Sequence, residues 1–329
     1  MRFAPTLFAL AFLAFALPAA AEPNAGFQVI QVPDPQGPPI EVGVWYPTDA
    51  PATAPARGMG NIKVAYGAPL QGQKLPLVVM SHGNGGWFGG HYDTAITLAK
   101  AGFVVAALTH TGDNYKDQSR ATDMANRPRQ LHVLIDYMLG DWTEHARLDP
   151  KRVGAFGFSS GGFTVLAAAG GEPDLRRIEA QCGAHPSHYE CQMVKRSPVG
   201  AEAFTTPWTH DPRIRAVVSA APALGYTFKA ESLKALTQPV QLWRAADDEI
   251  LPDPFHASAV KAALPASVDY HVVAKARHFD FLTPCDDYAR KNLPVLCASN
   301  PDFDRAAFHH TFNAAVTAFF TARLALTHP

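Results

Sequence analysis

Short continuous apolar runs alternate along this chain with longer segments in which apolar residues recur at helical spacing. Such runs are typical of buried strands, and such spacing is typical of helices packed on a sheet. The runs predict strands over residues 27–32, 40–46, 75–81, 103–109, 151–156, 213–221, 239–244 and 268–273. The helical segments are 92–101, 130–139, 162–169 and 305–326.

The order of these segments predicts the fold class. Strands alternate with helices over most of the chain, which favours an α/β fold with a mostly parallel central sheet and helices on both faces. Strands 27–32 and 40–46 are separated by Pro and Gly and predict an opening hairpin. Residues 47–74, rich in Pro, Ala and Gly, are expected to form an extended surface loop. Sites in such sheets lie at the carboxyl ends of the strands.

Residues 172–211 break this regular alternation. The segment holds two cysteines and several His and Pro residues, with little apolar periodicity. We interpret it as a cap-like insertion over the site. The remainder, 22–329, is expected to be one domain that carries this insertion, and the chain contains no internal repeat.

Composition narrows the class of protein. The chain has 329 residues, of which 47% are hydrophobic and 17% charged, so it can bury a substantial core and is not a disordered protein. The formal net charge is -1, which gives no support to nucleic acid or an anionic membrane surface as a partner. Composition selects no particular oligomeric state.

The N-terminus has the pattern of a secretory signal peptide over residues 1–21. Arg2 supplies the positive charge, 7–17 is a short apolar core, and small residues at 19–21 predict cleavage near Ala21. The apolar core is too short to anchor the chain across a bilayer, and no transmembrane segment is expected in the mature protein. We therefore expect export to the periplasm or the extracellular space.

Export makes disulfide bonds plausible for the four cysteines. Four cysteines allow three connectivities. We favour the local pairs Cys182–Cys191 and Cys285–Cys297, because each would close a short polar loop. The spacing lacks the C-x-x-C pairs that are typical of zinc sites, so no metal is expected.

The segment Gly157-Phe158-Ser159-Ser160-Gly161 lies between a predicted strand and a predicted helix. Strand, G-x-S-x-G and helix in that order are the context of a nucleophile elbow, in which a strained turn exposes the serine above the sheet. Ser159 fits the pattern and is the predicted nucleophile, and the backbone N–H of Ser160 is a predicted oxyanion donor. The alternative is an ordinary Gly-rich turn.

A second Gly-rich segment, 82–86, follows the buried strand 75–81. In an enzyme with an elbow serine, this loop is the natural source of a second oxyanion donor. We assign that donor to the backbone N–H of Asn84 and interpret His82 as structural. Alternatively, the loop only turns the chain.

A serine nucleophile needs a base, and the base needs an orienting acid, in the chain order Ser, acid, His. The loop after strand 239–244 offers Asp247, Asp248 and Glu249, of which we select Asp248, with Asp247 as the second choice. The loop after the last predicted strand contains His278, the predicted base.

Taken together, these motifs resemble the α/β-hydrolase family, in particular its branch of predicted dienelactone hydrolases, platelet-activating-factor acetylhydrolases and secreted polyester hydrolases. The motifs that carry the resemblance are Val44-Trp-Tyr-Pro47, Ser81-His-Gly-Asn-Gly-Gly86, His110-Thr-Gly-Asp113, Gly157-Phe-Ser-Ser-Gly-Gly162, Asp248-Glu-Ile-Leu-Pro252 and His278-Phe-Asp-Phe-Leu282. One departure argues against dienelactone as the substrate: true dienelactone hydrolases use Cys where this chain offers Ser159.

The resemblance implies the triad Ser159, Asp248 and His278, oxyanion donors at Asn84 and Ser160, and no cofactor. It implies hydrolysis of a small-molecule, lipid or polyester ester through an acyl-enzyme. An amide or lactone substrate is the alternative with the same triad. A binding protein with a dead site on the same scaffold is the alternative from another class.

The expected pocket walls are the insertion 172–211 and the segments 222–225 and 84–88. Three aromatic side chains near these segments are candidates for an apolar acyl site, with plain core packing as the alternative. They are Trp87, Phe88 and Phe163.

Overall fold

The structure is a computed structural model that describes residues 24–55, 63–265 and 267–325. The predicted signal peptide and its cleavage site lie outside the described residues. Within the described residues, no helix is both long and apolar enough to cross a membrane.

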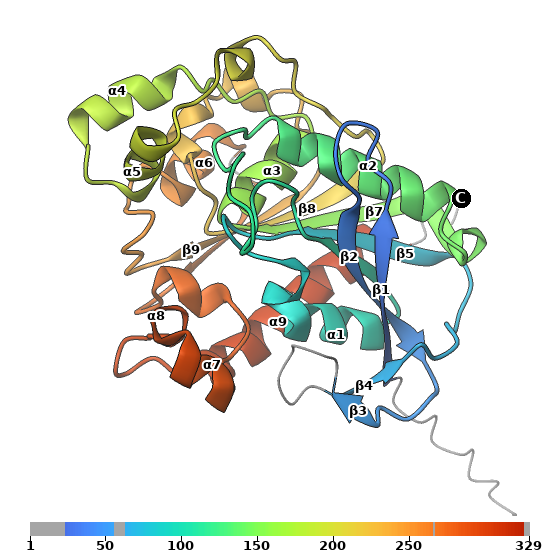
Figure 1. Cartoon of the computed structure of the whole chain (residues 1–329). Coiled ribbons are helices and arrows are strands. Elements are labelled where there is room, and N and C mark those ends of the chain that lie inside the picture. Colours follow the sequence, from blue (N-terminus) through green and yellow to red (C-terminus); the bar gives the residue numbers. More distant parts are fainter. Residues whose placement is uncertain (1–23, 56–62, 266, 326–329) are drawn as a thin grey trace, which may run out of the picture.

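A mixed sheet forms the centre of the described chain (Figure 1). Its ten strands are in the order β10-β9-β8-β7-β5-β6-β2-β1-β4-β3. The strands from β10 to β6 in this order run parallel, and β2 is antiparallel to both β6 and β1. The strands are β1 Asn24–Val32, β2 Ile40–Thr48, β3 Ala54–Pro55, β4 Lys63–Tyr66, β5 Leu75–Ser81, β6 Val104–Leu108, β7 Leu148–Phe158, β8 Ile214–Ala220, β9 Val240–Ala245 and β10 Asp269–Val273.

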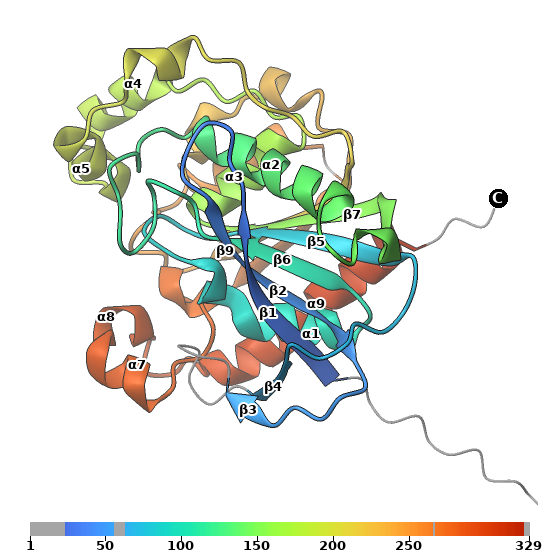
Figure 2. The same ribbon diagram turned by 45° about the vertical axis from the view of Figure 1, so that its right-hand side comes forward.

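Helices cover both faces of the sheet, which confirms the predicted α/β-hydrolase fold. Helices α2 and α3 pack on one face and α1 and α9 on the other (Figure 2). The helices are α1 Tyr92–Lys100, α2 Asn126–Gly140, α3 Ser160–Ala168, α4 Arg177–Ala184, α5 Tyr189–Arg196, α6 Ala257–Ala263, α7 Asp287–Asn292, α8 Pro294–Cys297 and α9 Arg305–Arg323.

The apolar pattern explains why these elements occupy these places. Every residue of β5 is buried, as its continuous apolar run predicts for a strand with a helix layer on each side. On α9 the buried residues Phe312, Val316 and Phe320 recur every fourth position and form one apolar stripe toward the sheet. Asp304 caps this helix by accepting a hydrogen bond from the Ala307 N–H.

The expectation of an extended surface loop over 47–74 is wrong in part, as its described residues 47–55 and 63–74 show. This segment contributes β3 and β4, and β4 pairs in parallel with β1 through Gly26–Ala65 and Phe27–Tyr66. Two of the four residues of β4 are buried and two are exposed, so the apolar signal is too short to mark a strand.

The insertion 172–211 contains helices α4 and α5, which the apolar pattern did not predict. They lie together at one end of the sheet, at the upper left of Figure 1. Only Ile178 is buried on α4, and only Glu190 and Cys191 on α5. Helices that bury so few side chains leave no apolar stripe in the sequence.

Both local cysteine pairs are disulfide bonds in the structure. Cys182–Cys191 joins α4 to α5 within the insertion. Cys285–Cys297 encloses α7 and ends at the last residue of α8. All four cysteines are therefore bonded.

Candidate active site

The turn from β7 into α3 holds Ser159 in a strained conformation, with φ 57° and ψ -120°. A residue other than Gly rarely takes a positive φ, and such strain is concentrated at functional sites. Backbone segments approach each other closely on both sides of this turn, and only glycine, which has no Cβ, fits at positions 157 and 161. A Cβ on Gly157 would lie 2.0 Å from the Gly161 carbonyl oxygen, and one on Gly161 would lie 1.9 Å from that of Ser81.

Ser159, His278 and Asp248 lie in hydrogen-bond contact although they come from three separate loops. The His278 Nε2 atom is 3.0 Å from Ser159 Oγ, and His278 Nδ1 is 2.8 Å from Asp248 Oδ2. His278 is 1% exposed and Ser159 is 8% exposed. A buried carboxylate on Nδ1 favours the tautomer whose Nε2 lone pair faces the serine hydroxyl.

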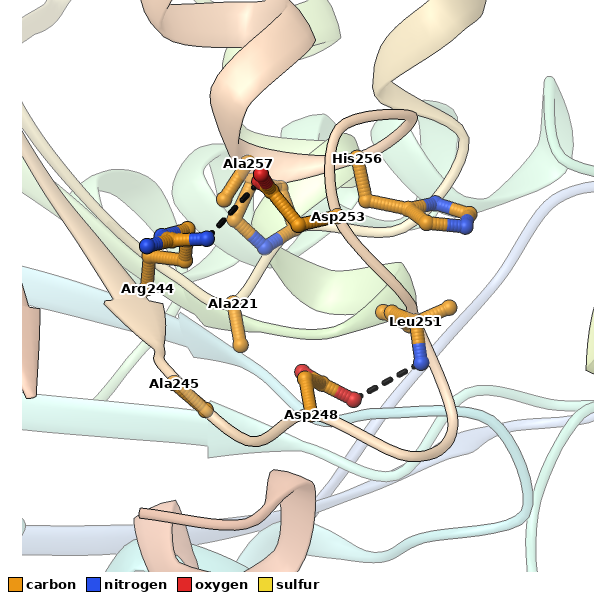
Figure 3. Close-up of a pocket in the computed structure, with 9 residues that line it drawn as sticks. Ala221, Arg244, Ala245, Asp248, Leu251, Asp253, His256 and Ala257 are labelled. Carbon is orange, nitrogen blue, oxygen red and sulfur yellow. Dashed lines mark hydrogen bonds and ion pairs between the residues drawn. The ribbon is translucent and has the colours of Figure 1, made fainter. Parts of the chain in front are cut away.

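The three acids after β9 have different partners. Asp248 Oδ1 accepts hydrogen bonds from the N–H groups of Ile250 at 3.1 Å and Leu251 at 2.7 Å, and these bonds fix its carboxylate for His278. Figure 3 shows the bond from Leu251. Asp247 Oδ2 instead accepts from the Asn300 side chain at 2.9 Å. Glu249 pairs with Arg277 at 2.8 Å and accepts the His278 backbone N–H at 3.3 Å.

The Gly-rich loop after β5 lies against the elbow, since a Cβ on Gly83 would be 3.2 Å from Ser159 Cβ. The backbone N–H groups of Asn84 and Ser160 have no hydrogen-bond acceptor within the described residues. Ser160 is the first residue of α3, where helix geometry leaves N–H groups unpaired and the dipole attracts negative charge.

The Asn84 side chain is held on both sides. Its Nδ2 donates to Asp113 Oδ1 at 2.7 Å, and the Gly85 N–H donates to the same oxygen at 2.9 Å. Its Oδ1 accepts from the Tyr189 hydroxyl at 2.7 Å. The loop is thus fixed to the segment after β6 and to helix α5 of the insertion.

A buried Arg127–Asp113 ion pair supports this loop, and no sequence pattern predicted that the two residues would pair. Their side chains are 2% and 3% exposed. Arg127 also donates to the His82 carbonyl oxygen and, at 3.0 Å, to Thr164 Oγ1 on α3. Neither apolar periodicity nor a motif marks Arg127, in the first turn of α2, as a buried charged residue.

His82 has the structural role expected of it. It is 4% exposed, and its Nε2 accepts the His110 backbone N–H at 2.9 Å. Burial lowers the pKa of His82 well below its usual range, and the nearby Arg127 guanidinium lowers it further. The imidazole is neutral at pH 7 and can accept that hydrogen bond.

A pocket lined mainly by apolar side chains opens beside the serine. The insertion contributes more of its lining than any other segment, whereas the aromatic candidates do not line it. The lining residues are Ala121, Thr122, Met124, Ser159, Ser160, Ile178, Tyr189, Glu190, Met193, Val194, Val199, Ala223, Leu224 and Leu251. Phe163 packs against Trp208 and Phe228, and Phe88 packs against Phe27 and Trp45, so these two belong to the core.

A protein-family model and a solved structure both match most of this chain. The model of a family described as "Dienelactone hydrolase family" matches residues 62–274, a span that includes Asn84, Ser159 and Asp248 and ends before His278. A solved structure described as a ferulic acid esterase from Streptomyces cinnamoneus superposes with a TM-score of 0.60 at 20% identity. It covers 95% of both chains and shows a shared fold.

Two curated relatives match over shorter stretches. "Lipase 1" of Moraxella sp. (strain TA144) is 35% identical over 92 residues, which are 28% of this chain and 27% of that protein. "Putative esterase NocK" of Nocardia uniformis subsp. tsuyamanensis is 28% identical over 131 residues, 39% of this chain and 38% of that protein. The matches thus span well under half of either relative.

Proposed function

Since this chain belongs to the dienelactone hydrolase family, we propose that it is an exported serine hydrolase that cleaves carboxylic esters. The observation that carries the proposal is the continuous contact from Ser159 through His278 to Asp248, with 3.0 Å and 2.8 Å between the bonded atoms. A nucleophile, a base and an orienting acid in hydrogen-bond reach are the parts that acyl transfer requires.

In the proposed reaction, Ser159 Oγ attacks the ester carbonyl while its proton passes to His278 Nε2. The resulting oxyanion is bound by the N–H groups of Asn84 and Ser160, and one such donor is typically worth about 10²–10³ in rate. His278 then gives the proton to the departing alcohol, and an acyl-enzyme remains. Water, activated by the same histidine, releases the acid and restores Ser159.

Asp248 stays ionised throughout this cycle and stabilises the imidazolium form of His278. Its two backbone hydrogen bonds, from the N–H groups of Ile250 and Leu251, hold the carboxylate in place. The cycle requires no cofactor.

The substrate class that we propose is a small-molecule, lipid or polyester ester whose acyl or alcohol part is apolar. The mainly apolar lining of the pocket beside Ser159 supports it. The names of the relatives, a lipase and a putative esterase, and of the ferulic acid esterase support ester chemistry in the same way. Amide or lactone hydrolysis uses the same groups and is the second candidate.

Export to the periplasm or the extracellular space is part of the proposal. The two disulfide bonds support it, because structural disulfides persist in oxidising compartments. The Cys182–Cys191 bond lies in the insertion that lines the pocket. A reducing cytosol would break this bond, so an oxidising compartment preserves the pocket wall.

A fluorophosphonate probe tests the proposal on the purified full chain. We expect covalent labelling of one serine, located by peptide mass spectrometry at Ser159 rather than Ser160, and turnover of p-nitrophenyl esters. Ser159→Ala should abolish both, whereas Ser119→Ala, at an exposed position, should change neither. A folded protein without labelling or turnover would instead be a binding protein on a hydrolase scaffold.

A further inference from the structure

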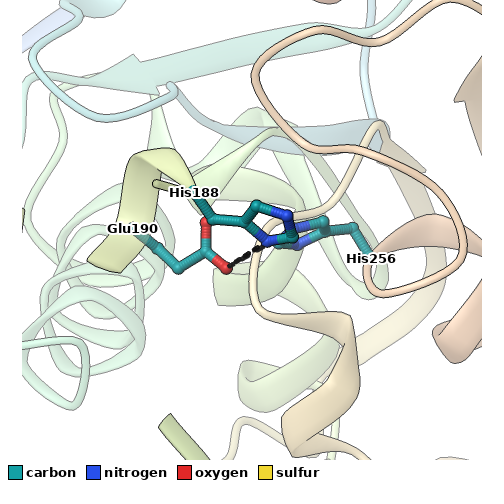
Figure 4. Close-up of side chains that lie close together, drawn as sticks. All are labelled: His188, Glu190 and His256. Atoms are coloured by element: carbon teal, nitrogen blue, oxygen red, sulfur yellow. Dashed lines mark ion pairs between the residues drawn. The ribbon is translucent and has the colours of Figure 1, made fainter. Parts of the chain in front are cut away.

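Three potential metal ligands from two parts of the chain converge beside the pocket. His188 immediately precedes α5, Glu190 is in its first turn, and His256 immediately precedes α6. One ligand atom from each lies within 4.8 Å of the other two (Figure 4). Glu190 Oε1 is 3.7 Å from both His188 Nδ1 and His256 Nε2.

Two of these side chains are buried without partners. Glu190 is 7% exposed and His256 is 1% exposed. Within the described residues, neither carboxylate oxygen of Glu190 and neither ring nitrogen of His256 has a hydrogen bond. Buried polar atoms are nearly always bonded, and an unpaired one costs free energy, so this cluster lacks a group that would satisfy it.

A cation would satisfy these atoms. Carboxylate oxygens and imidazole nitrogens can each offer a lone pair to the same ion.

We propose that His188, Glu190 and His256 form a binding site for a divalent transition-metal ion of the zinc type. Two imidazoles and one carboxylate are a donor set that suits Zn²⁺ and poorly suits Ca²⁺ or Mg²⁺, which prefer oxygen ligands. With metal–ligand bonds of about 2.0–2.2 Å, tetrahedral ligands lie about 3.4 Å apart, so the 3.7 Å contacts need only small side-chain movements.

The surroundings of the cluster favour a fixed geometry. The centroid of the Phe255 ring lies 5.4 Å from that of the His188 ring. The long 3.4 Å contact from Gln181 Nε2 to His188 Nδ1 would give way when Nδ1 binds the ion. The disulfide at Cys191 ties the same helix to α4. Ordered groups around metal ligands hold them in the orientation that binding requires.

A metal ion here would join the insertion to the body of the protein. His256 belongs to the segment between the proposed acid Asp248 and α6, whereas Glu190 belongs to the insertion and lines the same pocket as Ser159. The ion would therefore fix one wall of the pocket. This inference stands without the proposed esterase activity, because binding is measured with no substrate.

Calorimetric titration of the metal-free full chain with Zn²⁺ tests the site. We expect one ion per chain, a Tm that rises with Zn²⁺ concentration, and no binding of Ca²⁺. Glu190→Gln and His256→Gln should each weaken Zn²⁺ binding at least about 100-fold, the upper end of losses caused by changing mere supporting groups. His310→Gln, at an exposed position, and His278→Gln in the proposed triad should retain Zn²⁺ binding.

Titration of the unmutated chain with Co²⁺ tests the same site without reliance on variant folding. Co²⁺ bound by two imidazoles and a carboxylate should give visible absorption that Zn²⁺ displaces. The proposal is overturned if the chain binds no Zn²⁺, or if the Glu190 and His256 variants bind it as the unmutated chain does. Loss of binding in His278→Gln alone would place the ion at the triad instead and would also overturn it.

Discussion

The Tyr189 hydroxyl donates a 2.7 Å hydrogen bond to the side-chain oxygen of Asn84. Tyr189 begins helix α5 of the insertion, and Asn84 supplies a proposed oxyanion donor. The two residues are 105 positions apart in the sequence, so the bond links the wall of the pocket to the proposed catalytic loop. A change in the insertion can thereby alter the geometry around the reacting carbonyl.

We therefore expect Tyr189→Phe to lower kcat/KM for esters about 2- to 10-fold, the effect of losing one ordinary hydrogen bond. The fold should not change, because the ring remains and the hydroxyl is at a partly open position. Steady-state kinetics and Tm measure the two effects separately. Tyr66→Phe, which removes a hydroxyl from a side chain that is 61% exposed, is the control. Equal kinetics in both variants would show that the Asn84 contact has no role.

The choice between neighbouring acids gives a sharper prediction. Asp248→Asn places an amide beside His278 Nδ1, which favours the wrong tautomer, and should lower kcat on the order of 10⁴-fold. Asp247→Asn should stay within about 10-fold of the unmutated chain, since Asp247 contacts Asn300 and not His278. The two variants make the same Asp-to-Asn change at adjacent positions, so only the contacts of the carboxylate differ. A larger loss in Asp247→Asn would reverse our assignment of the acid.

Local sequence patterns predicted the elbow, since a strand, a strained turn and a helix are consecutive in the chain. The closeness of the proposed acid and base to Ser159 could also be predicted, because the order of strands places the loops that carry them at the same edge of the sheet. Among the three acids, Asp248 differs by its 2.8 Å contact to His278 Nδ1 and by the N–H groups of Ile250 and Leu251 that its carboxylate accepts. These contacts depend on the folded loop and are not encoded in a local pattern.

The parts that sequence patterns missed depend on contacts between distant segments. Arg127 and Asp113 are buried because they satisfy each other and several backbone groups, and periodicity does not report such compensation. Glu190 and His256 come together only when the insertion packs beside the segment before α6. Phe88 and Phe163 were candidates for lining the pocket because the sequence alone does not distinguish an apolar side chain in the core from one in a pocket wall.

The buried Arg127–Asp113 pair leads to a prediction of stability. Arg127→Met should lower the free energy of unfolding by about 3–5 kcal/mol, because it leaves the Asp113 carboxylate buried without its cation. Chemical denaturation measures this change. Arg120→Met is the matched control, since the Arg120–Asp123 pair is 48% and 24% exposed and should contribute no more than about 1 kcal/mol. A similar small effect for both variants would mean that Arg127 does not hold the loop.

His91 is 4% exposed, and we expect it to make the fold sensitive to acid. Its ring centroid lies 5.1 Å from that of Phe156 and 5.2 Å from that of Phe158, both in edge contact. Burial lowers the pKa of His91 to about 4 from its ordinary 6.5, although the nearby Asp93 opposes the shift and His309 adds to it. Between pH 6.5 and 4 the unfolded chain therefore binds a proton that the folded chain does not, and stability falls as the pH falls.

Replacing His91 with Phe keeps an aromatic ring against Phe156 and Phe158 and removes this proton. We expect the free energy of unfolding of His91→Phe, measured by urea at several pH values from 6.5 to 4, to fall less steeply than that of the unmutated chain. The difference in slope should approach about 1.4 kcal/mol per pH unit, the value for one proton. His310→Gln, which removes an exposed histidine, is the control, and its slope should match that of the unmutated chain. If the slope for His91→Phe also equals that of the unmutated chain, His91 binds its proton equally in the folded and unfolded states. Other buried groups would then cause the acid sensitivity.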